Sequence, residues 1–88
     1  MSFNEDTENI IKVTVLKNAL EYKGKSRVDT VIARIIGSRP DFRSNLKNLI
    51  PKITETVQKI NSLSLADQKA LLEQVAPGES QKRKIAER

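Results

Sequence analysis

The 88-residue sequence contains no cysteine and no histidine. Without cysteine, the chain can form no disulfide, zinc–thiolate site, iron–sulfur cluster or thiol nucleophile. Without histidine, it lacks the most common general base and metal ligand. The three glycines are far apart, so there is no glycine-rich phosphate loop. We therefore predict no catalytic, cofactor-binding or metal-binding residues, and we expect no enzymatic activity from these 88 residues alone.

Long apolar runs are also absent. No stretch approaches the ~20 apolar residues of a membrane-spanning helix, and the acidic start of the chain does not resemble a signal peptide. A chain of this length buries only ~60–65% of its unfolded surface, which leaves little room for a deep pocket. We therefore expect one small domain in the cytoplasm, with no membrane partner.

Positive charge is what the chain does have. Sixteen Lys and Arg side chains against eleven Asp and Glu give a net charge of +5 at neutral pH. The charge is uneven, because residues 1–8 are acidic while residues 9–59 carry eleven basic and four acidic side chains. Such a surplus attracts polyanions at long range. Solvated lysines on an ordinary helical domain would give the same composition.

The spacing of apolar residues predicts an all-α fold, with helices at about residues 9–23, 27–37, 42–60 and 65–75. Residues 10–15 alternate like a strand, but the apolar pattern continues too far for one strand. Pro51 interrupts the third segment, so the helix either kinks there or gives way to two helices; we favour two helices, the first ending near Asn48. The prediction is a compact bundle of four to five short helices at 9–77. An acidic disordered N-terminus at 1–8 precedes it, and a flexible basic C-terminal tail at 78–88 follows.

Local motifs predict where the helices begin and end. Ser26 with Asp29, and Ser64 with Asp67, have the spacing of a helix N-cap and an acid three residues later. Gly24 and Gly37 are expected to end the first two helices, since glycine readily takes a positive φ. In the last helix, the expected inward residues are Leu65, Leu71, Leu72 and Val75.

Two groups of cations are candidates for phosphate contacts. In each, basic side chains follow a predicted helix end, and the first group also has an aromatic neighbour, Tyr22. The same cations would also be present if they only formed a charged rim around an apolar core, with Tyr22 packed inward. A helix-turn-helix is a further but weak reading of the second group. The candidate nucleic-acid-binding residues are Lys23, Lys25 and Arg27 in the first group, and Arg39, Arg43 and Lys47 in the second.

Three stretches carry a resemblance to a known family. Residues 18–25 read Asn-Ala-Leu-Glu-Tyr-Lys-Gly-Lys; Gly37 is followed by Arg-Pro-Asp-Phe-Arg at 39–43; and Ile-Asn-Ser-Leu-Ser at 60–64 precedes Gln68. This order resembles the N-terminal helical domain of the archaeal and eukaryotic type of glutamyl-tRNA synthetase. The corresponding domain of eukaryotic glutaminyl-tRNA synthetase is related. The resemblance spans roughly residues 10–75.

The resemblance implies an appended domain that assists weak, sequence-tolerant tRNA binding, or assembly with other translation proteins. Glutamate–tRNA ligation, with ATP as the cofactor, would belong to a catalytic part absent from this chain, and 78–88 would be the linker toward it. Two other classes stay open. One is a protein–protein docking module, and the other is a free-standing basic DNA-binding protein.

Overall fold

The computed structural model describes residues 5–77. All regular secondary structure in that range is helical, so the predicted all-α fold is confirmed. Residues 10–15, which could have formed a strand, lie inside the first helix. The elements are α1 (Glu5–Glu21), α2 (Val28–Ser38), the 3-10 helix η1 (Pro40–Asn45), α3 (Leu46–Asn61) and α4 (Leu65–Val75).

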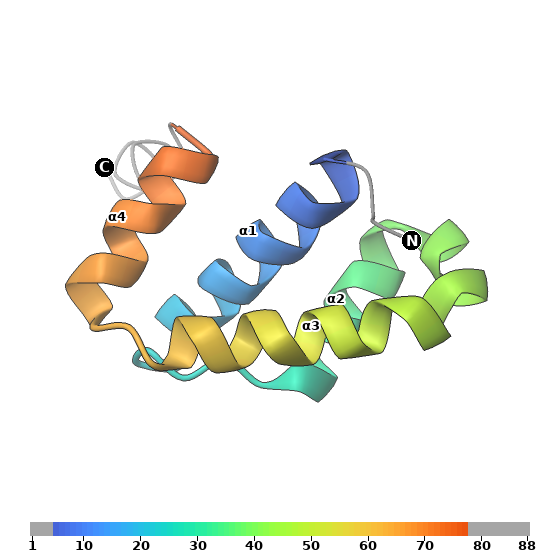
Figure 1. Cartoon of the computed structure of the whole chain (residues 1–88), viewed down its shortest axis with the longest axis horizontal. Coiled ribbons are helices and arrows are strands. Elements are labelled where there is room, and N and C mark those ends of the chain that lie inside the picture. Colours follow the sequence, from blue (N-terminus) through green and yellow to red (C-terminus); the bar gives the residue numbers. More distant parts are fainter. Residues whose placement is uncertain (1–4, 78–88) are drawn as a thin grey trace.

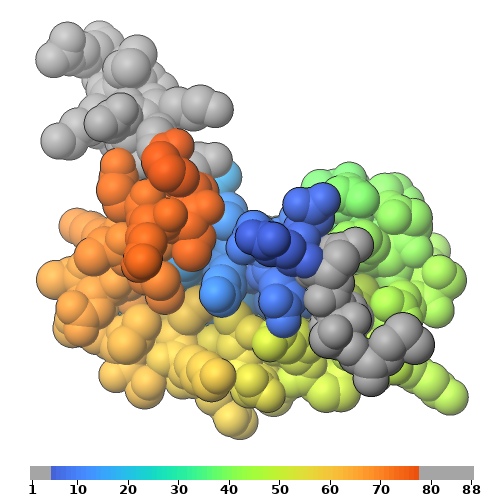
Figure 2. Space-filling view, turned by 45° about the horizontal axis from the view of Figure 1, so that its top comes forward, coloured from blue at the N-terminus to red at the C-terminus, as the bar shows by residue number. Residues whose placement is uncertain are grey.

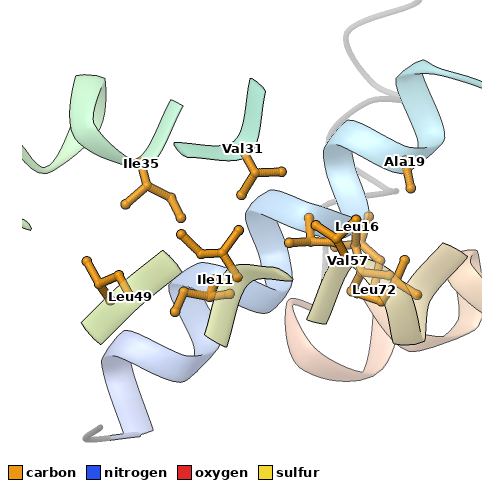
Figure 3. Close-up of a cluster of buried hydrophobic side chains, with 11 residues drawn as sticks. Ile11, Leu16, Ala19, Val31, Ile35, Leu49, Val57 and Leu72 are labelled. Carbon is orange, nitrogen blue, oxygen red and sulfur yellow. The ribbon is translucent and has the colours of Figure 1, made fainter. Parts of the chain in front are cut away.

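Helix α1 lies at the centre and packs against α2, α3 and α4 (Figures 1 and 2). Its buried face therefore supplies a large share of the core, and the other helices each add one or more apolar side chains from their inner faces (Figure 3). The alternation of one buried stripe with exposed charged positions is the pattern that apolar spacing predicts. The buried apolar core consists of Ile11, Val15, Leu16, Ala19, Val31, Ile35, Leu49, Ile53, Val57, Ile60 and Leu72.

The first helix begins at Glu5, so the prediction of a disordered segment up to residue 8 is wrong from residue 5 onward. Glu5, Asp6 and Glu8 lie in the first turn, where the positive end of the helix dipole favours acidic side chains. Glu8 also pairs with Lys52 of α3 at 3.5 Å. The other predicted terminal segments, residues 1–4 and the tail at 78–88, lie outside the described residues.

The predicted helix break near Asn48 is also wrong. The break falls at Asn45, where η1 gives way to α3, and α3 continues through Pro51. An interior proline costs ~3 kcal/mol. Leu49 and Ile53, on either side of Pro51, are buried, and such burial contributes about 1.5–3 kcal/mol for each side chain. Burial of the same face of α3 on both sides of Pro51 therefore offsets the free-energy cost of the proline. Pro51 itself faces solvent.

Of the other predicted features at helix ends, one is confirmed and two are wrong. Ser64 caps α4 as expected, because its side chain accepts a hydrogen bond from the Asp67 backbone N–H. Gly37 does not end α2, which continues to Ser38. Leu65, expected to face inward, is 44% exposed, because it lies at the first position of α4, beside the α1–α2 connection.

Candidate nucleic-acid interface

The connection between α1 and α2 is a tight turn that requires a left-handed backbone. Lys23 has φ 58° and Gly24 has φ 93°, and the Lys25 N–H donates to the Tyr22 carbonyl at 3.2 Å. The Gly24 N–H donates to the Ala19 carbonyl at 2.7 Å, which closes the end of α1. Positive φ at a residue other than glycine is uncommon. Helix α1 ends at Glu21, two residues before the predicted end at residue 23. Gly24 does take the positive φ expected of it, and Lys23 shares this left-handed conformation.

Ser26 does not cap α2, so the prediction of a capping box with Asp29 is wrong. The N-cap position is Arg27, without a side-chain hydrogen bond, and Ser26 is buried. The Ser26 hydroxyl donates to Asn18 Oδ1 at 2.9 Å, and the Arg27 backbone N–H donates to the same oxygen at 2.8 Å. The buried amide of Asn18 on α1 therefore holds the end of the turn.

Asn61, the last residue of α3, holds the backbone of the same serine. The Ser26 N–H donates to Asn61 Oδ1 at 2.7 Å, and Asn61 Nδ2 donates to the Ser26 carbonyl at 3.0 Å. Every polar group of Ser26 thus has a partner on α1 or α3. Since Asn18 and Asn61 are 8 and 35 residues away in sequence, helix-end motifs could not reveal this arrangement.

Gln68 on α4 provides the third attachment. Its buried side chain donates from Nε2 to the carbonyls of Gly24 at 2.9 Å and Ile60 at 2.8 Å. The turn at 22–27 is therefore fixed to α1, α3 and α4 together, and it lies beside the α3–α4 connection (Figure 1). We call Asn18, Asn61 and Gln68 the amide clamp. The clamp was not predicted from the sequence; its only sequence signal is polar amides placed within or next to apolar stripes.

The clamp fixes the backbone from which the first predicted cations project. Lys23, Lys25 and Arg27 are all exposed, and Arg27 makes only a loose ion pair with Asp29 at 3.9 Å. Tyr22 is 48% exposed, so the alternative in which this ring packs into the core is wrong. The basic turn, residues 22–27, thus presents an aromatic ring and three cations on a rigid backbone.

A neighbouring acidic residue is neutralised within the domain. Glu21, the last residue of α1, accepts two hydrogen bonds from the Arg34 guanidinium, at 2.9 and 2.5 Å. These hydrogen bonds and the Glu21 charge raise the pKa of Arg34 further above its usual value. The negative charge closest in sequence to the basic turn is therefore compensated, and the local field stays positive.

The second predicted group lies at the other end of α2. All three are exposed: Arg39 lies between α2 and η1, Arg43 on η1, and Lys47 in the first turn of α3. The Arg39 guanidinium lies 4.9 Å from the centre of the Phe42 ring and pairs with Asp41 at 3.6 Å. The eleven residues of α2 correspond to a length of about 16 Å. The structure thus separates the two groups, and only the first is attached to a clamp.

Metal-binding clusters and membrane-spanning helices are absent from the residues that the structure describes. In the range 5–77, no three His, Cys, Asp or Glu side chains gather in a way that could hold a metal ion. Every helix of the same range falls short of the length and hydrophobicity that a bilayer crossing requires. The fold and the site together define a small all-helical domain with a rigid basic turn.

Comparison with known proteins gives a consistent result. The chain is 38% identical over 72 residues to the glutamate–tRNA ligase of Pyrococcus abyssi, and 37% identical over 70 residues to that of Methanococcus maripaludis strain C7. It is 34% identical over 73 residues to the ligase of Thermococcus kodakarensis. The matches cover 80–83% of this chain but only 13% of each relative. No family model and no solved structure matches the chain.

These matches confirm the predicted resemblance to the N-terminal helical domain of the archaeal type of glutamyl-tRNA synthetase. The chain is therefore similar to a part of glutamate–tRNA ligases that makes up 13% of their length.

Proposed function

We propose that this domain binds tRNA, weakly and with little sequence preference, on behalf of a glutamate–tRNA ligase. In this proposal, ligation and ATP binding belong to a catalytic part outside these residues, and the domain acts in protein synthesis in the cytoplasm. The similarity to three archaeal ligases supports the choice of tRNA over DNA. The choice of tRNA rests on the reaction for which these relatives are named, and the proposed mode of binding rests on the basic turn.

The observation that supports binding best is the rigid presentation of Lys23, Lys25 and Arg27. Phosphate contacts supply affinity without reading sequence, because every nucleotide offers the same charged oxygens. Long basic side chains on a mobile loop would lose entropy when they bind. Here the backbone is already ordered by the amide clamp. Arg39, Arg43 and Lys47 form a second, separate contact in this proposal.

Salt dependence tests this function directly. If about four phosphates are contacted, the slope of log K against log salt is roughly −3 to −4, at ~0.7–0.9 for each phosphate. The double variant Lys25→Ala with Arg27→Ala is expected to lower affinity evenly across tRNA species and to make the slope shallower by about 1.5 units. The double variant Arg43→Ala with Lys47→Ala tests the second group in the same way.

A matched control separates local contacts from net charge. Lys12→Ala with Lys52→Ala removes two charges from α1 and α3 at residues that belong to neither group, and is expected to leave the slope unchanged. Because Lys52 pairs with Glu8, circular dichroism checks that this variant is folded. Binding by the parent domain that does not respond to salt would overturn the proposal. A preference for duplex DNA over tRNA would support the DNA-binding alternative instead. A salt-insensitive complex with a translation protein would support the docking alternative.

A further inference from the structure

Exposed apolar side chains gather at the basic turn. Among the described residues, the large apolar side chains with high exposure are Tyr22 at 48%, Leu65 at 44% and Ile50 at 41%. Leu65 Cδ1 lies 3.7 Å from the position that a Cβ on Gly24 would occupy, so Leu65 borders the turn that Tyr22 begins. Two of these three side chains therefore lie on or next to the turn that carries Lys23, Lys25 and Arg27.

Tyr22 is not needed for the core. It belongs neither to the buried apolar cluster nor to the partly buried side chains packed against it. Its carbonyl closes the turn by accepting from the Lys25 N–H, an interaction that any residue at position 22 could make. The ring thus begins the turn that carries three exposed cations, and about half of its surface stays in water. Phosphate contacts alone would not need an aromatic ring there.

We propose that Tyr22 stacks on an unpaired base, so the basic turn takes a single-stranded or looped-out nucleotide rather than the interior of a duplex. The inference rests on the proposed tRNA-binding function and deepens it. An aromatic ring beside cations is the usual arrangement for single strands, because every base offers a flat face and every nucleotide a phosphate. In a duplex the bases stack on each other, and a side chain reaches only their edges and the phosphates.

The chain contains one tyrosine and no tryptophan, so its intrinsic emission reports on Tyr22 alone. A short single-stranded oligoribonucleotide and a hairpin duplex of the same length are titrated into the full chain. The anisotropy of a labelled RNA reports binding, and tyrosine emission reports stacking. The expected result is quenching by the single strand at the concentrations where anisotropy rises, with tighter binding of the single strand than of the hairpin.

Variants then separate stacking from charge. Tyr22→Ala is expected to weaken single-strand binding about tenfold. The slope of log K against log salt should stay the same, because no cation is removed. Tyr22→Phe is expected to retain the affinity, since it keeps the ring. Ile50→Ala, which removes a similarly exposed apolar side chain on α3, is expected to have no effect. Circular dichroism of each variant confirms that it is folded.

Several outcomes would overturn the inference. Salt-dependent binding with unchanged tyrosine emission, or equal effects of Tyr22→Ala on single strand and hairpin, would refute stacking while tRNA binding stands. Loss of affinity in Tyr22→Phe as large as in Tyr22→Ala would mean that the hydroxyl, not the ring face, makes the contact. No rise in anisotropy with tRNA or either oligonucleotide would refute the proposed function together with the stacking.

Discussion

Removal of the Asn61 side chain is expected to destabilise the domain by about 2 kcal/mol. Asn61→Ala deletes the partners of both the N–H and the carbonyl of Ser26, a buried residue, at 2.7 and 3.0 Å. Each hydrogen bond contributes about 0.5–1.5 kcal/mol net, and a buried group left unpaired costs about 1–3 kcal/mol. Asn61 itself is half-buried, so water can reach part of the site and limit the loss.

The assay is thermal and urea unfolding followed by far-UV circular dichroism. For a domain of this size, 1 kcal/mol shifts Tm by about 4–8 °C, so the expected decrease is about 8–16 °C. The matched control is Asn48→Ala on the same helix. Asn48 Nδ2 donates to Asn45 Oδ1 at 2.6 Å, but this pair is exposed, and the expected change is within about 0.5 kcal/mol. Equal melting temperatures for the two variants would refute the role assigned to the amide clamp.

Two further substitutions test the backbone. Gly24→Ala is expected to destabilise the domain by about 1–2 kcal/mol in urea unfolding, because φ is 93° there, whereas the nearest side-chain atoms at 3.6–3.8 Å leave room for the methyl group. Gly37→Ala, inside α2 with nothing within 4 Å of the added carbon, is expected to stabilise by about 0.5–1 kcal/mol; the same sign for both variants would contradict this account. Pro51→Ala is expected to raise the free energy of unfolding by about 1–2 kcal/mol, since it restores an N–H that can donate to the Lys47 carbonyl; a lower melting temperature would mean that Pro51 fits α3 without cost.

The helices could be predicted because their signals are local. Apolar residues spaced three and four apart place Leu49, Ile53 and Val57 on one buried face whatever the rest of the chain does. Boundaries were less accurate where two local signals compete. At Pro51 the proline opposes the helix and burial favours it, and only the tertiary packing decides between them.

The site was only half predictable, for a different reason. The cations of the basic turn were identified from local sequence, but the hydrogen bonds that hold the turn were not. A serine at position 26 is compatible both with a helix N-cap and with hydrogen bonds to residues far away in the sequence. Its hydroxyl and backbone pair with Asn18 and Asn61, whose proximity exists only after α1 and α3 have packed. Hydrogen bonds that satisfy a buried serine are stronger constraints than a cap at an exposed helix end, so the tertiary partners prevail.

Charge and rigidity at the basic turn therefore come from different parts of the chain, and experiments can separate them. Lys25 contributes a charge, and its loss should make the salt dependence of tRNA binding shallower. Asn61 contributes order without charge, so its loss should weaken binding while the salt dependence stays the same, since the same phosphates are contacted by a less ordered turn. If Asn61→Ala loses stability but binds tRNA as tightly as the parent, the clamp serves folding alone, and the cations act from a backbone that need not be rigid.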